Sequence, residues 1–257
     1  MDTWNPDQYV KFQREREQPF ADLLAMIQPA PAMRVIDLGC GTGSLTRKLH
    51  MALNAHETVG LDRSERMLEV ARREPPVPGL RFETRAIEAF EAHGAYDLIF
   101  SNAALHWVES HETLMPRLYE ALKPGGQLAF QVPAMHDTLT HALPDRLTKA
   151  QAFRGRFAGW TRPQPVLTPE AYSRLLFRVG FSAPRVTLTI YPHVLSSRDE
   201  VVEWMRGTLL TDYEKRLTAD DFLAFTEAFR QRLLPQLPDE RPFFFPFRRI
   251  LCWGRKA

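Results

Sequence analysis

A glycine-rich turn between a short apolar strand and an amphipathic helix constrains the fold of this 257-residue chain most strongly. The segment reads MRVIDLGCGTGSLTRKLH, in which Val35, Ile36 and Leu38 predict a buried strand. Three glycines follow, and Leu45 and Leu49 then stand at helical spacing. Glycine lets the backbone approach a ligand closely, and the helix directs its amide end at the same place. The segment therefore predicts a ligand site at the turn.

The same alternation of strand and helix continues for about 100 residues, which favours right-handed crossovers and a parallel sheet. Strands are expected at 35–38, 59–61, 80–83, 97–101 and 127–132, with helices around Leu45 and Leu49, after Ser64 and over 112–122. Strands at 186–191 and 243–253 bring the number to seven. We therefore expect an α/β fold with a doubly wound, mostly parallel seven-stranded sheet, whose ligand lies beyond the carboxyl ends of the strands.

After Pro133 the alternation stops, and two helical excursions at 134–167 and 196–241 interrupt the pattern. They are too far apart in the sequence to form a separate domain, so we expect helical lid insertions over the ligand edge. The whole chain, 1–257, is then one domain. Its parts are an N-terminal helix within 1–30 that Pro19 interrupts, a core at 33–133, the two insertions, and a last strand within 242–257.

Composition excludes several classes of protein. Hydrophobic residues make up 44% and charged residues 25%, as in soluble globular proteins. No apolar run reaches the length of a membrane helix, and residues 1–30 lack an apolar signal-peptide centre. Cys40 and Cys252 cannot form a disulfide framework or a four-ligand zinc site, and no histidine pair has metal-binding spacing. We expect a cytoplasmic protein, monomeric or weakly dimeric, with no metal, membrane or nucleic-acid partner; its net charge is only +2.

Two acids define the ligand of the glycine turn. Asp37 would repel a phosphate group but suits an ammonium group, and Asp62, at the end of the second strand, can accept both hydroxyls of a ribose. An alternative role for Asp62 is capping the next helix, since Ser64 and Glu65 follow. The turn also lacks the third glycine of a dinucleotide fingerprint and the G-K-[ST] of a nucleotide-triphosphate loop. A positively charged adenosine ligand without phosphate fits best, and a nicotinamide-dependent oxidoreductase is disfavoured.

Four segments resemble the class I S-adenosylmethionine-dependent methyltransferases: VIDLGCGTG, VGLDRS, YDLIFSNAALHWV and LKPGGQL. The opening WNPDQYVKFQRER and the ending FPFRRILCWGRK narrow the resemblance to the trans-aconitate methyltransferase family. The resemblance implies a Rossmann-like fold, S-adenosyl-L-methionine as the cofactor, S-adenosyl-L-homocysteine as its product, and an antiparallel seventh strand. It is specific for cofactor and fold, and less so for substrate.

The resemblance also implies which residues hold the cofactor. The residues expected at its methionine end are Gly39, Cys40 and Gly41 through their backbone, Asp37 near the ammonium, Asn102 and Ala103 through their backbone, and Tyr9 from the capping helix. At the adenosine end, Asp62 would hold the ribose hydroxyls. The adenine would lie beside Arg63 and Met67 on one side and Ala86 and Ile87 on the other.

Two positions depart from the family pattern. Position 86 is usually an aspartate that accepts the adenine amino group, whereas this chain has Ala86, and Glu88 is the nearest acid. Loss of that hydrogen bond would cost about 1 kcal/mol. Trans-aconitate enzymes also carry an arginine near Thr211-Asp212-Tyr213, where this chain places an acid.

The substrate side is less defined by the sequence. His106 is the first candidate for a general base, because it follows Asn102 by four residues at the open edge of the sheet; His111 and His136 are weaker candidates. Trp107 is expected in the pocket wall. Residues expected to contact substrate in the insertions are Arg154, Arg156, Trp160 and Arg206, with Arg162, Arg248 and Arg249 as further cations. A solvated helix face is the alternative interpretation of these arginines.

We therefore expect direct in-line methyl transfer to a small molecule, with a carboxylic acid such as trans-aconitate as the first candidate. A carboxylate is ionised at pH 7 and needs no base. The alternatives are a phenol, amine or carbon nucleophile with His106 as base, and a cofactor-binding protein without catalysis.

Overall fold

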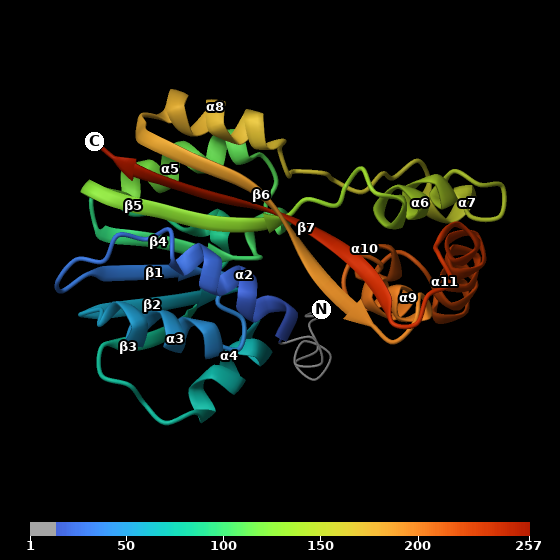
Figure 1. Ribbon diagram of the computed structural model, residues 1–257, viewed down its shortest axis with the longest axis horizontal. Helices are drawn as coiled ribbons and strands as arrows, with labels where there is room; N and C mark the ends of the chain where they lie inside the picture. The colour runs from blue at the N-terminus through green and yellow to red at the C-terminus, as the bar shows by residue number, and fades with distance from the viewer. Residues whose placement is uncertain (1–13) are drawn as a thin grey trace. The chain divides into compact units, whose positions relative to one another are not determined.

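The computed structural model describes residues 14–257, and in them seven strands form one sheet (Figure 1). The strands are β1 (Arg34–Leu38), β2 (Glu57–Asp62), β3 (Leu80–Thr84), β4 (Tyr96–Asn102), β5 (Leu122–Pro133), β6 (Phe181–Leu195) and β7 (Phe243–Lys256). Their order is β3-β2-β1-β4-β5-β7-β6. Neighbours from β3 to β5 pair in parallel, and β5 pairs with β7 in antiparallel fashion. The predicted doubly wound, mostly parallel sheet is confirmed.

The chain divides into two compact units. Of the described residues, the first contains 14–133, 165–189 and 249–257, and the second contains 134–164 and 190–248. Beyond the strands, the described elements of the first unit are α2 (Arg14–Leu24), α3 (Ser44–Leu53), α4 (Glu65–Arg73), η1 (Ile87–Ala89), η2 (Leu105–Trp107), α5 (His111–Ala121) and α8 (Pro169–Val179). Those of the second are α6 (Leu139–Thr148), α7 (Arg154–Phe157), α9 (Asp199–Arg206), α10 (Thr211–Glu214), α11 (Ala219–Leu233) and η3 (Leu234–Gln236).

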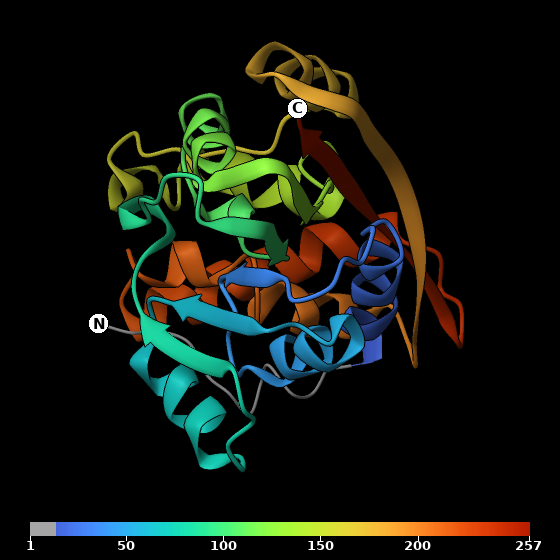
Figure 2. The same ribbon diagram turned by 90° about the vertical axis from the view of Figure 1, so that its left-hand side faces the viewer.

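In the first unit, helices lie on both sides of the central strands (Figure 2). Helices α2 and α3 contact each other, as do α5 and α8. The strands between them are buried on both faces because both are covered, which explains why β1 and β4 read as continuous apolar runs rather than as alternating patterns. The carboxyl ends of β1, β2 and β4 meet at one edge of the sheet, next to the glycine turn.

Local signals set several boundaries, among them the expected start of a helix after Ser64. The Ser64 hydroxyl accepts a hydrogen bond from the Met67 amide and begins α4, and Thr168 caps α8 in the same way. Gly180, with a φ of 110°, ends α8. In the second unit, the Thr218 hydroxyl accepts from the Asp221 amide at the start of α11.

Three local predictions are wrong. Leu122 was expected in a helix but begins β5, where it pairs with Tyr96 before a bulge carries the strand on past Gly125 and Gly126. Pro19 does not interrupt α2, because a missing amide removes one helical hydrogen bond without ending the helix. Strand β6 extends beyond the predicted 186–191 on both sides, since backbone pairing with a neighbour continues where the side-chain alternation weakens.

No helix within residues 14–257 is both long and apolar enough to cross a membrane.

Candidate functional site

The glycine turn joins β1 to α3, and its glycines are required by geometry. Gly39 has a φ of 79°, and a Cβ on it would lie 2.1 Å from the Cβ of Ala104 at the end of β4. Gly43 has a φ of 72°, and a Cβ there would lie 2.6 Å from the ring of Phe82. Any other residue would therefore be strained and would also displace a neighbour.

The amides at the start of this turn are occupied by the protein itself. The N–H groups of Gly39 and Cys40 both donate to the carbonyl of Leu61, at 2.7 and 2.9 Å. The Gly41 N–H donates to Oδ2 of Asp62 at 2.9 Å. Phosphate-binding turns work by presenting free N–H groups to the anion. Because these three donors are used, the turn is not built for a phosphate, as the sequence predicts.

Asp62 is held rigidly at the end of β2. Its Oδ2 accepts from Gly41, and its Oδ1 accepts from the Ser64 N–H at 2.9 Å. The α4 cap is the hydroxyl of Ser64, not the Asp62 carboxylate. Each oxygen of Asp62 keeps a second lone pair, so the half-buried carboxylate can still accept two hydroxyl donors in a fixed orientation.

Asp37 lies at the end of the neighbouring strand β1 and is 3% exposed. Its Oδ2 accepts a hydrogen bond from the Thr46 hydroxyl at 2.6 Å. Its Oδ1 is buried and has no hydrogen-bond partner among the described residues. The pKa of the Asp37 carboxyl is raised to about 7, chiefly by burial; the hydrogen bond from Thr46 lowers it, and the nearby charge of Asp62 adds a smaller increase. A buried carboxylate oxygen without a donor fits a cationic ligand group.

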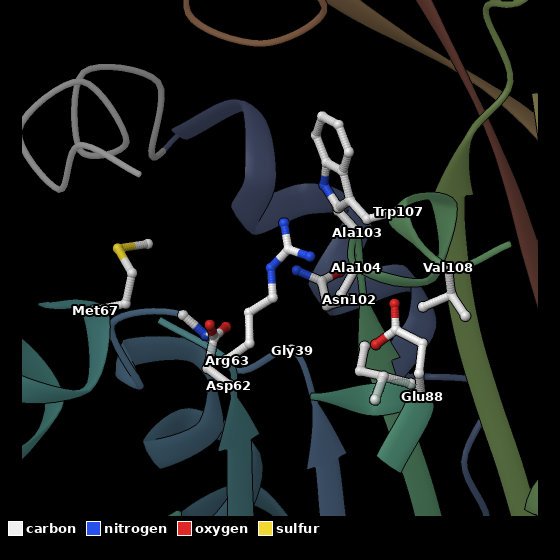
Figure 3. Close-up of a pocket in the computed structure, with 12 residues that line it drawn as sticks. Gly39, Asp62, Arg63, Met67, Glu88, Asn102, Ala103, Ala104, Trp107 and Val108 are labelled. Atoms are coloured by element: carbon white, nitrogen blue, oxygen red, sulfur yellow. The ribbon is translucent and has the colours of Figure 1, made fainter. Parts of the chain in front are cut away.

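A pocket of about 640 Å³, partly open to solvent, lies at this edge of the first unit (Figure 3). Its lining residues are Gly39, Gly41, Asp62, Arg63, Met67, Ile87, Glu88, Asn102, Ala103, Ala104, Trp107 and Val108. In Figure 3 the guanidinium of Arg63 extends from the end of β2 toward Asn102 and Trp107, and the Glu88 carboxylate approaches from another side.

The structure thus brings together eight of the residues that the resemblance assigned to the cofactor. These are Gly39, Gly41, Asp62, Arg63, Met67, Ile87, Asn102 and Ala103. Asp37, Cys40 and Ala86 are not among the lining residues. Cys40 stands between the lining residues Gly39 and Gly41, Ala86 precedes Ile87, and Asp37 lies two residues before Gly39. Tyr9 lies outside the described residues.

The end of β4 is fixed by a series of hydrogen bonds between polar side chains, which the sequence did not predict. The Gln131 amide nitrogen donates to Oδ1 of Asn102 at 2.8 Å, and Oε1 of Gln131 accepts from Arg249 at 3.1 Å. Gln131 and Arg249 are 1% and 3% exposed. Ala103 follows with a φ of 56°, a backbone conformation that is rare outside glycine and clusters at functional sites. Only the pairing of β5 with β4 and β7 brings these residues together.

The candidate base His106 stands beside the pocket rather than in its lining. Its ring lies 4.8 Å from the ring of Trp107, and Trp107 itself lines the pocket as predicted. His111 is fully buried: its Nε2 contacts the Leu105 carbonyl at 2.9 Å, and its Nδ1 contacts the Tyr172 hydroxyl at 2.6 Å. Burial lowers the pKa of His111, so it holds η2 against α8 as a neutral side chain.

The predicted substrate residues of the insertions belong to the second unit. Arg154 and Arg206 are exposed, and so is Arg156, which pairs with Asp221 at 2.7 Å. Trp160 stacks on Phe157 at 5.9 Å and carries the Arg216 guanidinium over its ring. Their contacts with substrate stay predictions.

Glu88, Ala104 and Val108 line the pocket without having been assigned to it from the sequence. The position of Glu88 two residues after Ala86 was the one available signal. In residues 14–257 no group of three His, Cys, Asp or Glu side chains is arranged to hold a metal ion.

The fold and the site are those of an S-adenosylmethionine-dependent methyltransferase. The sheet is mixed and its seventh strand is antiparallel, the amides at the start of the glycine turn are already hydrogen-bonded, and a carboxylate is fixed at the end of β2. Comparison with known proteins agrees. A family described as a methyltransferase domain matches residues 29–173. A solved S-adenosylmethionine-dependent methyltransferase from Mesorhizobium loti has a TM-score of 0.52 at 21% identity, covering 92% of this chain and 96% of its own.

Curated relatives specify the family. A trans-aconitate 2-methyltransferase of Deinococcus radiodurans is 41% identical over 255 residues, which cover 97% of this chain and 96% of that protein. A trans-aconitate 2-methyltransferase of Streptomyces avermitilis is 37% identical over 262 residues, covering 99% and 97%. The chain belongs to the trans-aconitate 2-methyltransferase family.

Proposed function

We propose that this protein methylates a carboxylate oxygen of a small organic acid, with trans-aconitate as the first candidate. The observation that carries the proposal is the similarity to trans-aconitate 2-methyltransferases over nearly the whole chain, at 41% identity. The site supports the cofactor side of this reaction in two ways. The amides at the start of the glycine turn are hydrogen-bonded within the protein, and the carboxylates of Asp37 and Asp62 are held in place by hydrogen bonds.

The residues of the first unit fit S-adenosylmethionine. When bound, the cofactor supplies a methyl group activated by its positively charged sulfur. Asp62 would accept the ribose hydroxyls, and the unpartnered Oδ1 of Asp37 would balance the ammonium group. Asn102 and Ala103 would present their backbone to the methionine part from a β4 end that Gln131 holds in place.

The adenine would lie beside Met67 and Ile87, which are both buried and line the pocket. Ala86 offers no side-chain acceptor for its amino group. The carboxylate of Glu88, which lines the same pocket, would supply that acceptor instead.

An acid acceptor suits a site whose candidate base lies outside the pocket lining. A carboxylate is ionised at neutral pH, so the protein has only to bind it, align it with the methyl group and exclude water. Trp107, which lines the pocket, would supply an apolar wall for that purpose.

Asp212, where the family pattern has an arginine, does not present an unbalanced negative charge. Its Oδ2 accepts from Nε of Arg162 and its Oδ1 from Nζ of Lys215, both at 3.1 Å. The two cations offset the charge of the acid, so the departure at this position is compatible with an anionic substrate.

A direct test is incubation of the purified protein with S-adenosylmethionine and a panel of acids, phenols and amines, followed by mass spectrometry. We expect S-adenosylhomocysteine and a monomethyl ester to appear in equal amounts with trans-aconitate or a related acid. Methylation of a phenol or amine, with no ester from any acid, would refute the proposed acceptor. Tight cofactor binding without turnover on any acceptor would indicate a non-catalytic protein.

His106→Ala separates an acid acceptor from one that needs a base. General bases typically contribute 10²–10⁴-fold to rate. With an acid as acceptor we expect kcat/KM within about threefold of the unsubstituted protein, because no proton is removed. A loss of about 100-fold or more would assign His106 as a base.

We also infer that the protein is one methyltransferase domain, with the 134–167 and 196–241 insertions acting as a lid, in a cytoplasmic monomer or weak dimer. Both cysteines are free and buried, which agrees with a reducing compartment. Sedimentation velocity at several concentrations tests the oligomeric state.

A further inference from the structure

The second unit contains a basic cluster, formed by His136, His141, Arg162 and Arg248, that the site in the first unit does not use. His136 and Asp137 lie in the turn between β5 and α6. This turn is tied to β7: the Ala134 N–H donates to the Arg248 carbonyl at 2.9 Å, and the Arg248 guanidinium pairs with Asp137. Arg248 therefore lies against the turn that carries His136.

His141 joins the cluster from the first turn of α6. Its Nδ1 lies 3.1 Å from the Thr140 hydroxyl and 3.4 Å from that of Thr138. The pKa of His141 is lowered to about 3, first by burial and then by the positive charges of Arg162, His136 and Arg248. The charges of Arg162, His136 and Arg248 are therefore near enough to the His141 ring to act on its pKa.

Arg162 is fixed in the same unit by its pairing with Asp212. The bond uses Nε of the guanidinium, and the Arg162 side chain is 13% exposed. Asp212 is shared with Lys215, so its single charge is divided between two cations. Because this bond uses Nε, it does not use the two terminal nitrogens of the planar guanidinium, which can also donate.

Two atoms of the cluster show that its hydrogen bonding is incomplete. Nε of Arg248 and Nδ1 of His136 are buried, and neither has a hydrogen-bond partner among the described residues. Within residues 14–257, Arg248 pairs with Asp137, whose side chain is 60% exposed and thus largely screened by solvent. A buried guanidinium N–H without an acceptor, beside an excess of positive charge, is suited to an anion, and arginine forks match carboxylates in particular.

We propose that His136, His141, Arg162 and Arg248 bind a carboxylate group of a small di- or tricarboxylic acid. The proposal rests on the proposed function and names the residues that hold the acid acceptor. It moves the acid-binding role from the exposed Arg154, Arg156 and Arg206, which the sequence suggested, to arginines that are fixed by partners.

The experiment measures binding of trans-aconitate by titration calorimetry to the full chain saturated with S-adenosylhomocysteine, which has no methyl group to transfer. Arg248→Gln and Arg162→Gln should each raise the dissociation constant of the acid at least tenfold. Arg232→Gln, which removes the same charge from an exposed position of α11 in the same unit, should change it less than twofold. The affinity for S-adenosylhomocysteine should stay unchanged in all three, and a cooperative melting transition should show that each variant is folded.

If Arg248→Gln does not fold, His136→Ala provides the second measurement, with the same expected weakening of acid binding. Equal acid affinity in the unsubstituted protein and in the cluster variants would overturn the assignment and leave the proposed function intact. Inorganic phosphate that binds as tightly as trans-aconitate, and is lost in the same variants, would overturn the carboxylate specificity. No binding of any acid to the unsubstituted complex, while phenols or amines are methylated, would overturn both proposals.

Discussion

The raised pKa of Asp37 makes a quantitative prediction about cofactor binding. Burial holds the pKa of this carboxyl at about 7 in the ligand-free protein, so half of the molecules carry a neutral Asp37 at pH 7. An ammonium group favours the ionised form. Binding should therefore select the ionised fraction, which is about 1/2 at pH 7 and about 1/11 at pH 6.

The affinity for S-adenosylhomocysteine should accordingly fall about fivefold, or ~1 kcal/mol, from pH 7 to pH 6, and nearly tenfold for each further unit. Binding at pH 7 should release about 0.5 proton. Titration calorimetry in two buffers with different heats of ionisation measures both quantities.

Asp37→Asn is the matched control, since asparagine keeps the size of the side chain and an acceptor for the Thr46 hydroxyl. It should weaken binding by roughly 1.5–3 kcal/mol, the scale for a charged hydrogen bond, and should remove the pH dependence. An affinity that does not change with pH in the unsubstituted protein, or the same dependence in Asp37→Asn, would refute the reasoning.

The raised pKa of Asp37 also makes the free energy of unfolding depend on pH. The folded-state pKa of Asp37 lies above its ordinary value of 3.8, so the folded state binds more protons between these two values. The contribution of Asp37 to the free energy of unfolding is therefore fully present below pH 3.8 and is lost as pH rises through about 7. Denaturant unfolding of the ligand-free protein and of Asp37→Asn should show this difference between pH 5 and pH 8.

Three further predictions follow from the site. Asp62→Ala should weaken S-adenosylhomocysteine binding by roughly 1–3 kcal/mol, and unchanged affinity in calorimetry would contradict the ribose assignment. Gly39→Ala should destabilise the fold by about 2–5 kcal/mol in denaturant unfolding, because of its positive φ and its contact with Ala104; Gly125→Ala, with a φ of 74° and nothing within 4 Å, should cost only about 1–2 kcal/mol. Glu88→Gln should reduce the preference for S-adenosylhomocysteine over its inosine analogue, which lacks the adenine amino group, and an unchanged preference would place the acceptor elsewhere.

The cofactor side of the site could be predicted because it depends on short segments. Glycine at 39 and 43 and an acid at 62 are required by local backbone geometry and by the ends of consecutive strands. Such features leave a signal within a few residues of sequence. Strand ends of a parallel sheet meet at one edge, so the order of elements was sufficient to place Asp62 near Gly41.

The boundaries that were missed depend on pairing rather than on local preference. Leu122 reads as the end of an amphipathic helix, yet its pairing with Tyr96 draws it into β5. Likewise, nothing near Asn102 predicts Gln131 and Arg249, because β5 and β7 join it through hydrogen bonds between residues 29 and 118 positions apart.

The class of fold and the glycine turn were predictable because periodicity and glycine placement act over a few residues, and the resemblance of short motifs to a methyltransferase family implied the cofactor. Which charged side chains are paired, and which are not, was not predictable from the sequence. The tertiary structure distinguished the exposed Arg154 from Arg162, whose partner Asp212 is 50 residues away, and it showed that Nε of Arg248 is buried without an acceptor among the described residues. The reason is physical: the energy of a charge depends on its solvent exposure and its neighbours, and both are set by the folded chain.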